Sequence, residues 1–254
     1  MCGLNQNYAM KIKGSNLSCA ICQPHYLPWI GYFEMIDRVD VFVFLDDVQF
    51  VKREWKNRNR IRKTSTGNET KWLTVPVVKQ YQHGLIKDAI VSQEFDWRSK
   101  HTESLKMVYR NTPYFDVYYP EIKNIIQESS CQTLSELNTS LIEYFCCKFK
   151  IDTKLMKSSD LNVNGKREAK LLNLCKEIKS GYYLANNATA EYVSKEYFLN
   201  ENIEFGIQNY VHPMYEQKSN GELLSFISHL SIVDIVFNQG PESIKIIREG
   251  GRQD

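Results

Sequence analysis

A dense run of basic residues between residues 52 and 63 is the strongest chemical signal in this 254-residue sequence. Within it, Arg58, Arg60 and Arg62 alternate with other residues, which places three guanidinium groups on one face of an extended chain. Guanidinium forks match phosphate oxygens bidentately, so a diphosphate or a phosphodiester is the predicted ligand. A solvated basic face is the alternative interpretation.

Three further residues of the same run are predicted to bind the substrate: Trp55, Lys56 and Asn57. The Trp55 ring could stack on a base or a sugar, although a packing role is equally open. A nucleic-acid surface would usually interleave several aromatic residues with the cations over a larger area, and this sequence lacks that pattern. We therefore expect a small phosphorylated ligand rather than a nucleic acid.

A polar loop follows the apolar segment at residues 17–22. It contains Gln23, His25 and Tyr26, and a histidine at this position could act as a general base. Ligands of open α/β sheets bind outside the carboxyl ends of the strands, so this loop is a predicted part of the site. A turn histidine bonded to the backbone is the alternative.

Two acids follow the apolar segment at residues 41–45. One of Asp46 and Asp47 could act as a base, orient a sugar hydroxyl or bind a metal, whereas the other would cap the following turn. Gln49 lies one pleat beyond Asp47 and could join the same face.

Candidate residues also occur at three more distant places. His101, at the start of a predicted helix, could be a general base, although a lone helical histidine is more often structural. Ser158 and Ser159 lie between a strand and a helix, where hydroxyl and N–H groups receive phosphates, with an ordinary helix cap as the alternative. Asp234 lies in an apolar helix, so its carboxylate needs a partner, which an arginine of the basic run would supply.

Composition narrows the class of protein. The formal net charge of +2 is too small to predict nucleic-acid binding by the whole surface. No run approaches the roughly 18 apolar residues that span a bilayer, and the N-terminus lacks the apolar core of a signal peptide, so we expect a cytoplasmic protein. The seven cysteines are an odd number, and Cys19 and Cys22 would point to opposite faces of a strand. Free thiols are therefore expected, and no metal site is predicted.

A parallel sheet is needed to bring these residues together. The apolar segments 17–22 and 41–45 read as buried strands joined by a short helix near 29–37, which is a parallel α/β unit. Strands and helices alternate to the end of the chain, with helical spacing near 97–150 and a last helix at 226–237.

These patterns predict the fold class and the domain organisation. We expect an α/β fold with a central, mostly parallel sheet that opens with the strand-helix-strand unit and carries a helical insertion near 97–150. Residues 1–15 would form a loosely ordered leader, and residues 16–254 would form a single domain, because no linker divides them.

The ordered set of motifs resembles the WbqC-like family, which is found in gene clusters for O-antigen and other surface polysaccharides. The matching segments are QPHYLPW with GYF at 23–33, DDVQF at 46–50, NRNRI at 57–61, WLTVP at 72–76, Trp97 with His101, Tyr109 with PYF at 113–115, Ser158 with Ser159, and LSIVD to NQG at 230–240. The likeness covers about residues 18–240.

The resemblance implies work on a nucleotide-activated sugar, often an amino sugar. We expect a transferase that moves an acyl or aminoacyl group onto the sugar, with Lys56, Arg58 and Arg60 on the diphosphate. The expected base is one of four side chains: His25, Asp46, Asp47 and His101. An acyl or aminoacyl donor would be the second reactant, and nucleic acid would enter only as an aminoacyl-tRNA.

Two other functions remain open from the sequence. The first strand, the loop with His25, the following helix and the Ser158–Ser159 pair resemble a nucleotidylyl transferase. However, residue 28 is proline, where that signature would place a second histidine. A non-catalytic scaffold of the polysaccharide assembly machinery is the third possibility, and it would expose a large apolar patch.

Overall fold

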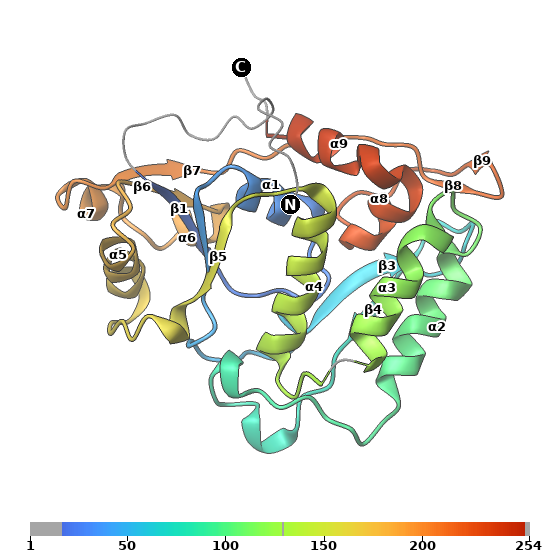
Figure 1. Ribbon diagram of the computed structural model, residues 1–254, viewed down its shortest axis with the longest axis horizontal. Coiled ribbons are helices and arrows are strands. Elements are labelled where there is room, and N and C mark those ends of the chain that lie inside the picture. Colours follow the sequence, from blue (N-terminus) through green and yellow to red (C-terminus); the bar gives the residue numbers. More distant parts are fainter. Residues whose placement is uncertain (1–16, 129, 252–254) are drawn as a thin grey trace, which may run out of the picture.

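Five parallel strands form the central sheet of the computed structural model, which describes residues 17–128 and 130–251 (Figure 1). The strands are β1 (Ser18–Cys22), β2 (Val41–Phe44), β5 (Lys154–Lys157), β6 (Tyr182–Ala185) and β7 (Glu204–Ile207). Their spatial order is β5-β2-β1-β6-β7, which is 3-2-1-4-5 when the strands are counted within the sheet. The α/β fold class is therefore confirmed.

The predicted strand-helix-strand unit opens this sheet. β1 and β2 are parallel neighbours, with Cys19 beside Val41 and Cys22 beside Phe44. The helix α1 (Ile30–Asp37) joins them. Both strands are buried along their whole length because helices cover both faces of the sheet.

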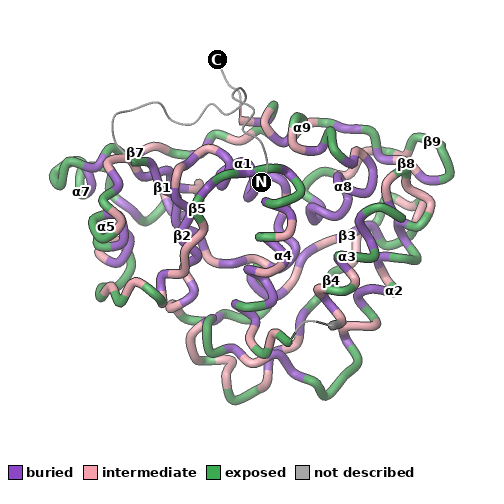
Figure 2. The backbone as a smooth tube through the Cα atoms, in the orientation of Figure 1, coloured by how far each residue is buried: buried purple, intermediate pink, exposed green. Residues whose placement is uncertain are grey.

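Alternate residues of the strands pack into two separate cores. The strands of the sheet are mostly buried, as Figure 2 shows. Ala20 and Cys22 face the larger core, which includes α1 and the long helix α4 (Leu134–Phe149). Cys19 and Ile21 face the smaller one, formed by the helices α5 (Arg167–Glu177) and α7 (Lys195–Leu199). The two cysteines thus point to opposite faces, as predicted.

The predicted helical insertion consists of α2 (Trp97–Tyr109), α3 (Phe115–Glu128) and α4. A capping box begins α4, because Thr133 and Glu136 each accept a hydrogen bond from the other's backbone N–H. In Figure 1, α2 and α3 lie side by side at the edge of the molecule, and α4 lies between them and the sheet.

An antiparallel hairpin of β3 (Arg58–Arg62) and β4 (Thr70–Thr74) carries the basic run. Asn59 and Ile61 are buried, whereas Arg58 and Arg60 are half-buried. The hairpin lies between α4 and the α2–α3 pair (Figure 1). The described residues also form one-turn 3-10 helices, which are η1 (Lys79–Tyr81), η2 (Ile86–Asp88), η3 (Ser158–Asp160) and η4 (Gly240–Glu242).

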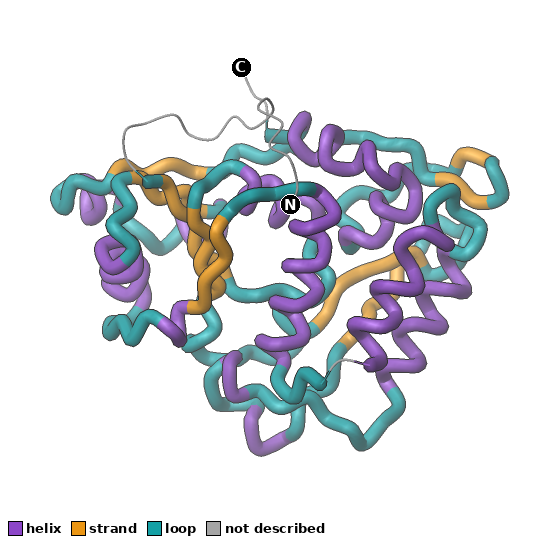
Figure 3. Tube along the Cα trace, in the orientation of Figure 1, coloured by secondary structure: helices purple, strands orange, loops and turns teal. Residues whose placement is uncertain are grey.

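The C-terminal part differs from the prediction. The last helix was expected at 226–237, but α8 begins at Ile232 and ends at Gln239, and α9 (Ser243–Glu249) follows. Residues 226–231 stay non-helical (Figure 3) because the N–H of Ser231 donates to the Arg60 carbonyl at 2.9 Å and that of Ile232 to the Pro28 carbonyl at 2.8 Å. Tertiary hydrogen bonds therefore replace the helical ones at this point.

The remaining elements are short. They are α6 (Asn187–Ala190), β8 (Lys218–Ser219) and β9 (Glu222–Leu223). The predicted leader at 1–15 lies outside the described residues, and the single domain at 16–254 stays a prediction. No helix in the described ranges has the length and apolar character needed to cross a bilayer.

Candidate functional site

The strand order reverses between β1 and β6, and this reversal marks one place for a ligand. In such sheets the loops after the two strands diverge to opposite faces, and ligands bind where they part. Cys22 ends β1, and Asn186 follows β6. The Asn186 side-chain amide donates to the Cys22 sulfur at 3.5 Å, and its oxygen caps α6.

His25 lies in the loop that leaves β1 at this place. Its half-buried ring is 5.1 Å from the Tyr32 ring, and the Tyr32 hydroxyl donates to the Gln23 carbonyl at 2.9 Å. Burial, together with the charge of Lys56, lowers the pKa of His25 from 6.5 to about 3. The imidazole is therefore neutral at pH 7 and has a free lone pair.

Lys56 connects the histidine loop with the basic run. Its side chain is buried, and its ammonium group pairs with the half-exposed carboxylate of Glu54. The Asn138 amide donates to the backbone carbonyls of both Pro24 and Lys56, at 2.9 and 2.7 Å. This buried amide on α4 fixes the two segments relative to each other, because each carbonyl needs a donor.

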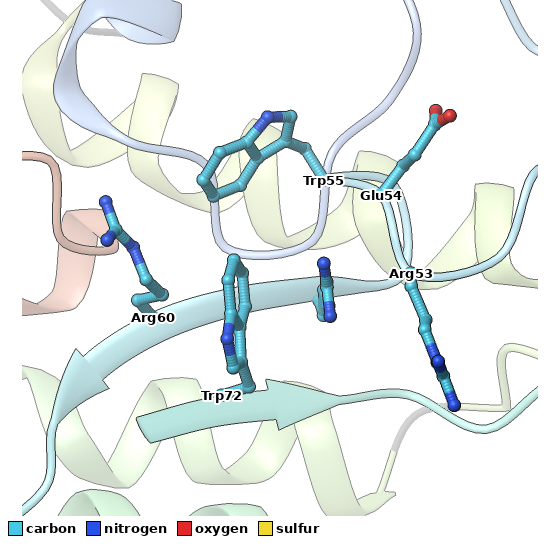
Figure 4. A pocket seen from close by; sticks show the side chains of 6 residues that line it. Arg53, Glu54, Trp55, Arg60 and Trp72 are labelled. Atoms are coloured by element: carbon cyan, nitrogen blue, oxygen red, sulfur yellow. The ribbon is translucent and has the colours of Figure 1, made fainter. Parts of the chain in front are cut away.

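A pocket of about 510 Å³ opens on the hairpin next to this connection (Figure 4). We call it the arginine–tryptophan pocket, and its lining residues are Arg53, Glu54, Trp55, Arg58, Arg60 and Trp72. Trp55 and Trp72 are each about two-fifths exposed, at 42% and 43%. The backbone N–H of Tyr26 donates to the Trp55 carbonyl at 3.0 Å, which joins the pocket to the histidine loop.

Strand register explains why arginine and tryptophan side chains meet in this pocket. Arg60 is paired with Trp72 across the hairpin, so both lie on the same face. The Arg58 guanidinium carbon lies 4.0 Å from the centre of the Trp72 ring, and that of Arg60 lies 5.7 Å away. In Figure 4 Trp55 lies above Trp72, and the two ring centres are 5.5 Å apart.

The cations of this pocket are incompletely satisfied. The Nε atoms of Arg58 and Arg60 are buried and have no hydrogen-bond partner among the described residues. One contact of the Arg60 guanidinium is a 3.5 Å hydrogen bond to the His229 carbonyl. The only carboxylate in the lining, Glu54, is already paired with Lys56. An anion of the right size would therefore find donors and uncompensated positive charge here.

Arg62, the third member of the alternating row, has a different environment. It is almost fully buried, and its guanidinium donates to the Gly67 carbonyl at 2.8 Å and also to Gln217 and the Ser225 carbonyl. Gln217 in turn donates to the buried carboxylate of Asp234 at 2.8 Å.

The expected arginine partner of Asp234 is therefore Arg62, which acts through its charge and through Gln217. The hydroxyls of Tyr109 and Tyr215 also donate to Asp234, at 3.0 and 2.8 Å. Burial nevertheless dominates and raises the pKa of this acid. The network lies in the core beneath the hairpin.

The two aspartates after β2 turn toward β5 rather than toward His25. The Asp46 carboxylate is buried and accepts hydrogen bonds from the Ser135 and Ser159 hydroxyls at 3.2 and 3.0 Å. The Asp47 carboxylate accepts from the Ser158 hydroxyl and from the Lys170 ammonium, both at 2.6 Å. Protein donors thus already satisfy both carboxylates, Lys170 balances the charge of Asp47, and the Ser158 and Ser159 hydroxyls are engaged.

The other predicted residues lie away from the pocket. The His101 ring is buried, with Nδ1 2.9 Å from the Tyr26 hydroxyl, and burial lowers its pKa to about 4. Gln49 is exposed and forms a backbone bridge with Leu85. The Asn57 amide is buried and donates to the Val75 carbonyl at 3.1 Å, so it supports the hairpin from below.

Four residues of this region were absent from the predicted site: Arg53, Glu54, Trp72 and Asn186. Trp72 would have been found if residues 58–62 had been paired with residues 70–74 as a hairpin, and Asn186 if the polar residue after β6 had been considered. Arg53 belongs to the basic run, but its place in the pocket lining could not be inferred, because its left-handed backbone (φ 59°) is visible only in the structure. The six described cysteines are free, and the described residues contain no cluster of three His, Cys, Asp or Glu side chains suited to a metal.

Comparison with known proteins gives a consistent match over this whole region. The model of the WbqC-like protein family matches residues 23–246, which include the histidine loop and the arginine–tryptophan pocket. The uncharacterized protein Rv1507c of Mycobacterium tuberculosis (strain ATCC 25618 / H37Rv) is 34% identical over 231 residues, which span 90% of this chain and 96% of that protein. No solved structure matches the chain significantly.

Proposed function

Because the chain belongs to the WbqC-like protein family, we propose that it is an enzyme of surface-polysaccharide biosynthesis that acts on a nucleotide-linked sugar. The family's gene neighbourhoods of O-antigen type support this pathway. The proposal includes a cytoplasmic location, which the free thiols support because such thiols are typical of a reducing compartment.

The arginine–tryptophan pocket is the observation that carries the proposal. Within the described part of the chain, Arg58 and Arg60 form no ion pair and their Nε donors are unpaired, and a diphosphate would accept from both guanidinium groups. The exposed rings of Trp55 and Trp72 offer a surface on which a base or a ribose can stack. A volume of about 510 Å³ falls within the range of small-molecule sites.

The reaction that we place first is acyl or aminoacyl transfer to a sugar amine. The amine nitrogen would bond to the carbonyl carbon of an ester or thioester donor, whose bond to its leaving group would break. The nitrogen would lose a proton in the same sequence, and His25 is the proposed acceptor of that proton. An aminoacyl-tRNA is one possible donor class, and the proposal requires no other nucleic acid.

The environment of His25 supports a base that becomes stronger when the substrate binds. Its pKa of about 3 reflects burial and the nearby charge of Lys56. A bound diphosphate would offset the smaller of these two causes, the charge of Lys56, and would therefore raise the pKa of His25 from this low value. We assign His101 a positioning role through Tyr26, and Asp46 and Asp47 a role in joining β2 to β5.

A nucleotidylyl transferase is the second candidate, and the strand order favours it. The 3-2-1-4-5 sheet would bind a nucleotide where the loops after β1 and β6 part, and His25 lies in the first of these loops. Pro28 stands where a second histidine of that signature would be. This candidate predicts binding of a nucleoside triphosphate near Asn186 instead of a diphosphate near Trp72.

Thermal unfolding in the presence of different ligands distinguishes these functions. The panel would contain UDP, dTDP, GDP, their hexose conjugates, ATP and acyl-CoA esters. A ligand at 100 times its Kd stabilises the folded state by about 2.7 kcal/mol. We expect a shift with a nucleoside diphosphate that Arg58→Ala weakens. A shift with ATP that Arg58→Ala leaves unchanged favours the second candidate, and no shift with any nucleotide rejects both.

A further inference from the structure

A cluster of aromatic and histidine side chains adjoins the Arg60 end of the pocket. The Trp29 ring is stacked with the His229 ring at 5.2 Å and is nearly parallel to the His212 ring at 6.2 Å. Tyr210 meets the edge of Trp29 at 5.4 Å, and the two histidine rings are 4.8 Å apart. We call these four residues the Trp29 cluster.

Backbone contacts tie the Trp29 cluster to β3. The Arg60 guanidinium donates to the His229 carbonyl at 3.5 Å, and its charge contributes to the lowered pKa of the His229 ring. Ser231 donates its N–H to the Arg60 carbonyl and forms a bridge with Trp29. A ligand that holds Arg60 through its diphosphate therefore reaches this cluster with its next group.

The Trp29 cluster and the adjoining Ser231 carry polar groups that the described residues leave unpaired. The Tyr210 hydroxyl, the His212 Nε2 and the Ser231 hydroxyl are buried and have no hydrogen-bond partner there. A buried polar group without a partner costs the folded state free energy. A group that donates and accepts hydrogen bonds would remove this cost.

The protonation state of His212 is suited to such a ligand. Its Nδ1 lies 2.8 Å from the Pro213 carbonyl, which can only accept, so Nδ1 carries the hydrogen. Burial and the neighbouring His229 lower the pKa of His212 to about 4, so the ring is neutral at pH 7. Nε2 is therefore an acceptor for a hydroxyl or an amine hydrogen.

Two strained or crowded positions hold the cluster in place. His229 has a left-handed backbone, with φ of 56°, which is unfavourable for a residue that carries a side chain. A Cβ at Gly31 would lie 2.4 Å from the Trp29 ring, so only glycine lets that ring lie over the start of α1. Such strain at an exposed histidine suggests a functional constraint.

We propose that the Trp29 cluster is the subsite for the sugar of the nucleotide-linked substrate, and this inference rests on the proposed function. A pyranose has apolar C–H faces and a rim of hydroxyl or amine groups. Aromatic rings match the faces, and the unpaired atoms of Tyr210 and His212 match the rim. The diphosphate on Arg58 and Arg60 would place the sugar here.

Isothermal titration calorimetry tests this subsite. UDP, dTDP and GDP would be compared with UDP-glucose, UDP-N-acetylglucosamine, dTDP-glucose and GDP-mannose. We expect at least one sugar conjugate to bind about 10-fold more tightly than its own diphosphate, the gain of one or two hydrogen bonds. His212→Phe and His229→Ala should abolish this gain and leave the affinity for the diphosphate within about 2-fold of wild type.

Control variants separate the two possible failures. His83→Ala changes an exposed histidine outside both sites and should retain the gain. If a diphosphate binds and Arg58→Ala weakens it, but no conjugate gains affinity or the gain survives in His212→Phe, the subsite is rejected while the proposed function stands. If no nucleotide binds, the proposed function and the subsite fall together. Because His229 is exposed, His229→Ala tests the subsite even if His212→Phe unfolds the chain.

Discussion

Two charged regions of this molecule differ in how their charges are satisfied. At the ends of β2 and β5, Asp46 and Asp47 accept hydrogen bonds from serine hydroxyls, and Asp47 also pairs with the Lys170 ammonium. In the arginine–tryptophan pocket, Arg58 and Arg60 face indole rings and form no ion pair with any described residue. Protein donors satisfy the carboxylates of the first region, and we propose that a ligand satisfies the guanidinium groups of the second. The number of charged residues alone would not distinguish the two regions, because both are rich in polar residues.

The largest expected effect concerns His25. His25→Ala should lower acyl transfer to a nucleotide-linked amino sugar by about 10²–10⁴-fold, the range for loss of a general base. Mass spectrometry of the acylated product, with acyl-CoA and aminoacyl-tRNA as donors, measures this rate. Affinity for the nucleotide should stay near that of wild type. If His25→Ala retained full turnover, His25 would not be the general base.

The pH dependence of the free energy of unfolding should show that His101 is buried and neutral in the folded chain. Its pKa is about 4 in the folded chain, against an ordinary 6.5, so the unfolded state binds more protons between these values. Stability should therefore fall as the pH falls through this window, by up to about 3 kcal/mol from His101. Urea unfolding of His101→Phe should show a shallower dependence. An unchanged dependence would contradict the buried, neutral assignment.

The pocket cations should dominate nucleotide affinity. Arg58→Ala and Arg60→Ala should each weaken a nucleoside diphosphate by about 1.5–3 kcal/mol, because each removes a charge-assisted contact. Lys63→Ala is the matched control, since Lys63 is exposed and pairs with Glu69 at 2.7 Å. Calorimetric Kd values for the three variants provide the test. Equal, small changes in Kd for all three variants would support the alternative interpretation, in which the basic run is a solvated face.

Substitution at the aspartates should change stability rather than nucleotide affinity. Asp47→Asn breaks the 2.6 Å pair with Lys170, whose side chain is 9% exposed, and leaves that ammonium without its anion. Unfolding free energy should fall by about 1–3 kcal/mol, while nucleotide affinity should not change. Asp152→Asn, at an exposed position, is the control. A loss of nucleotide affinity in Asp47→Asn would place the aspartates in the ligand site after all.

The central fold could be predicted because its determinants are local. Continuous apolar runs at β1 and β2 and the helical spacing of α2, α3 and α4 indicate their structures directly. The start of α8 could not be predicted, because the amides of Ser231 and Ile232 are used by Arg60 and Pro28, far away in sequence.

The site was only partly predictable for the same reason. Alternation placed Arg58, Arg60 and Arg62 on one face, but the burial of Arg62 depends on Gln217 and Ser225. Asp46 and His25 follow neighbouring strands, yet the serines after β5 attract the carboxylate. Such choices depend on contacts between distant segments, which no pattern within one segment contains.

A crystal structure with the most stabilising nucleoside diphosphate tests the central claim most directly. The account predicts density for the two phosphates within hydrogen-bond reach of Arg58 and Arg60, with the base or ribose against Trp55 or Trp72. It also predicts the phosphates on the Arg60 side that leads to the Trp29 cluster. A nucleotide seated between the loops after β1 and β6, beside Asn186 and without contact to Arg58 or Arg60, would contradict it.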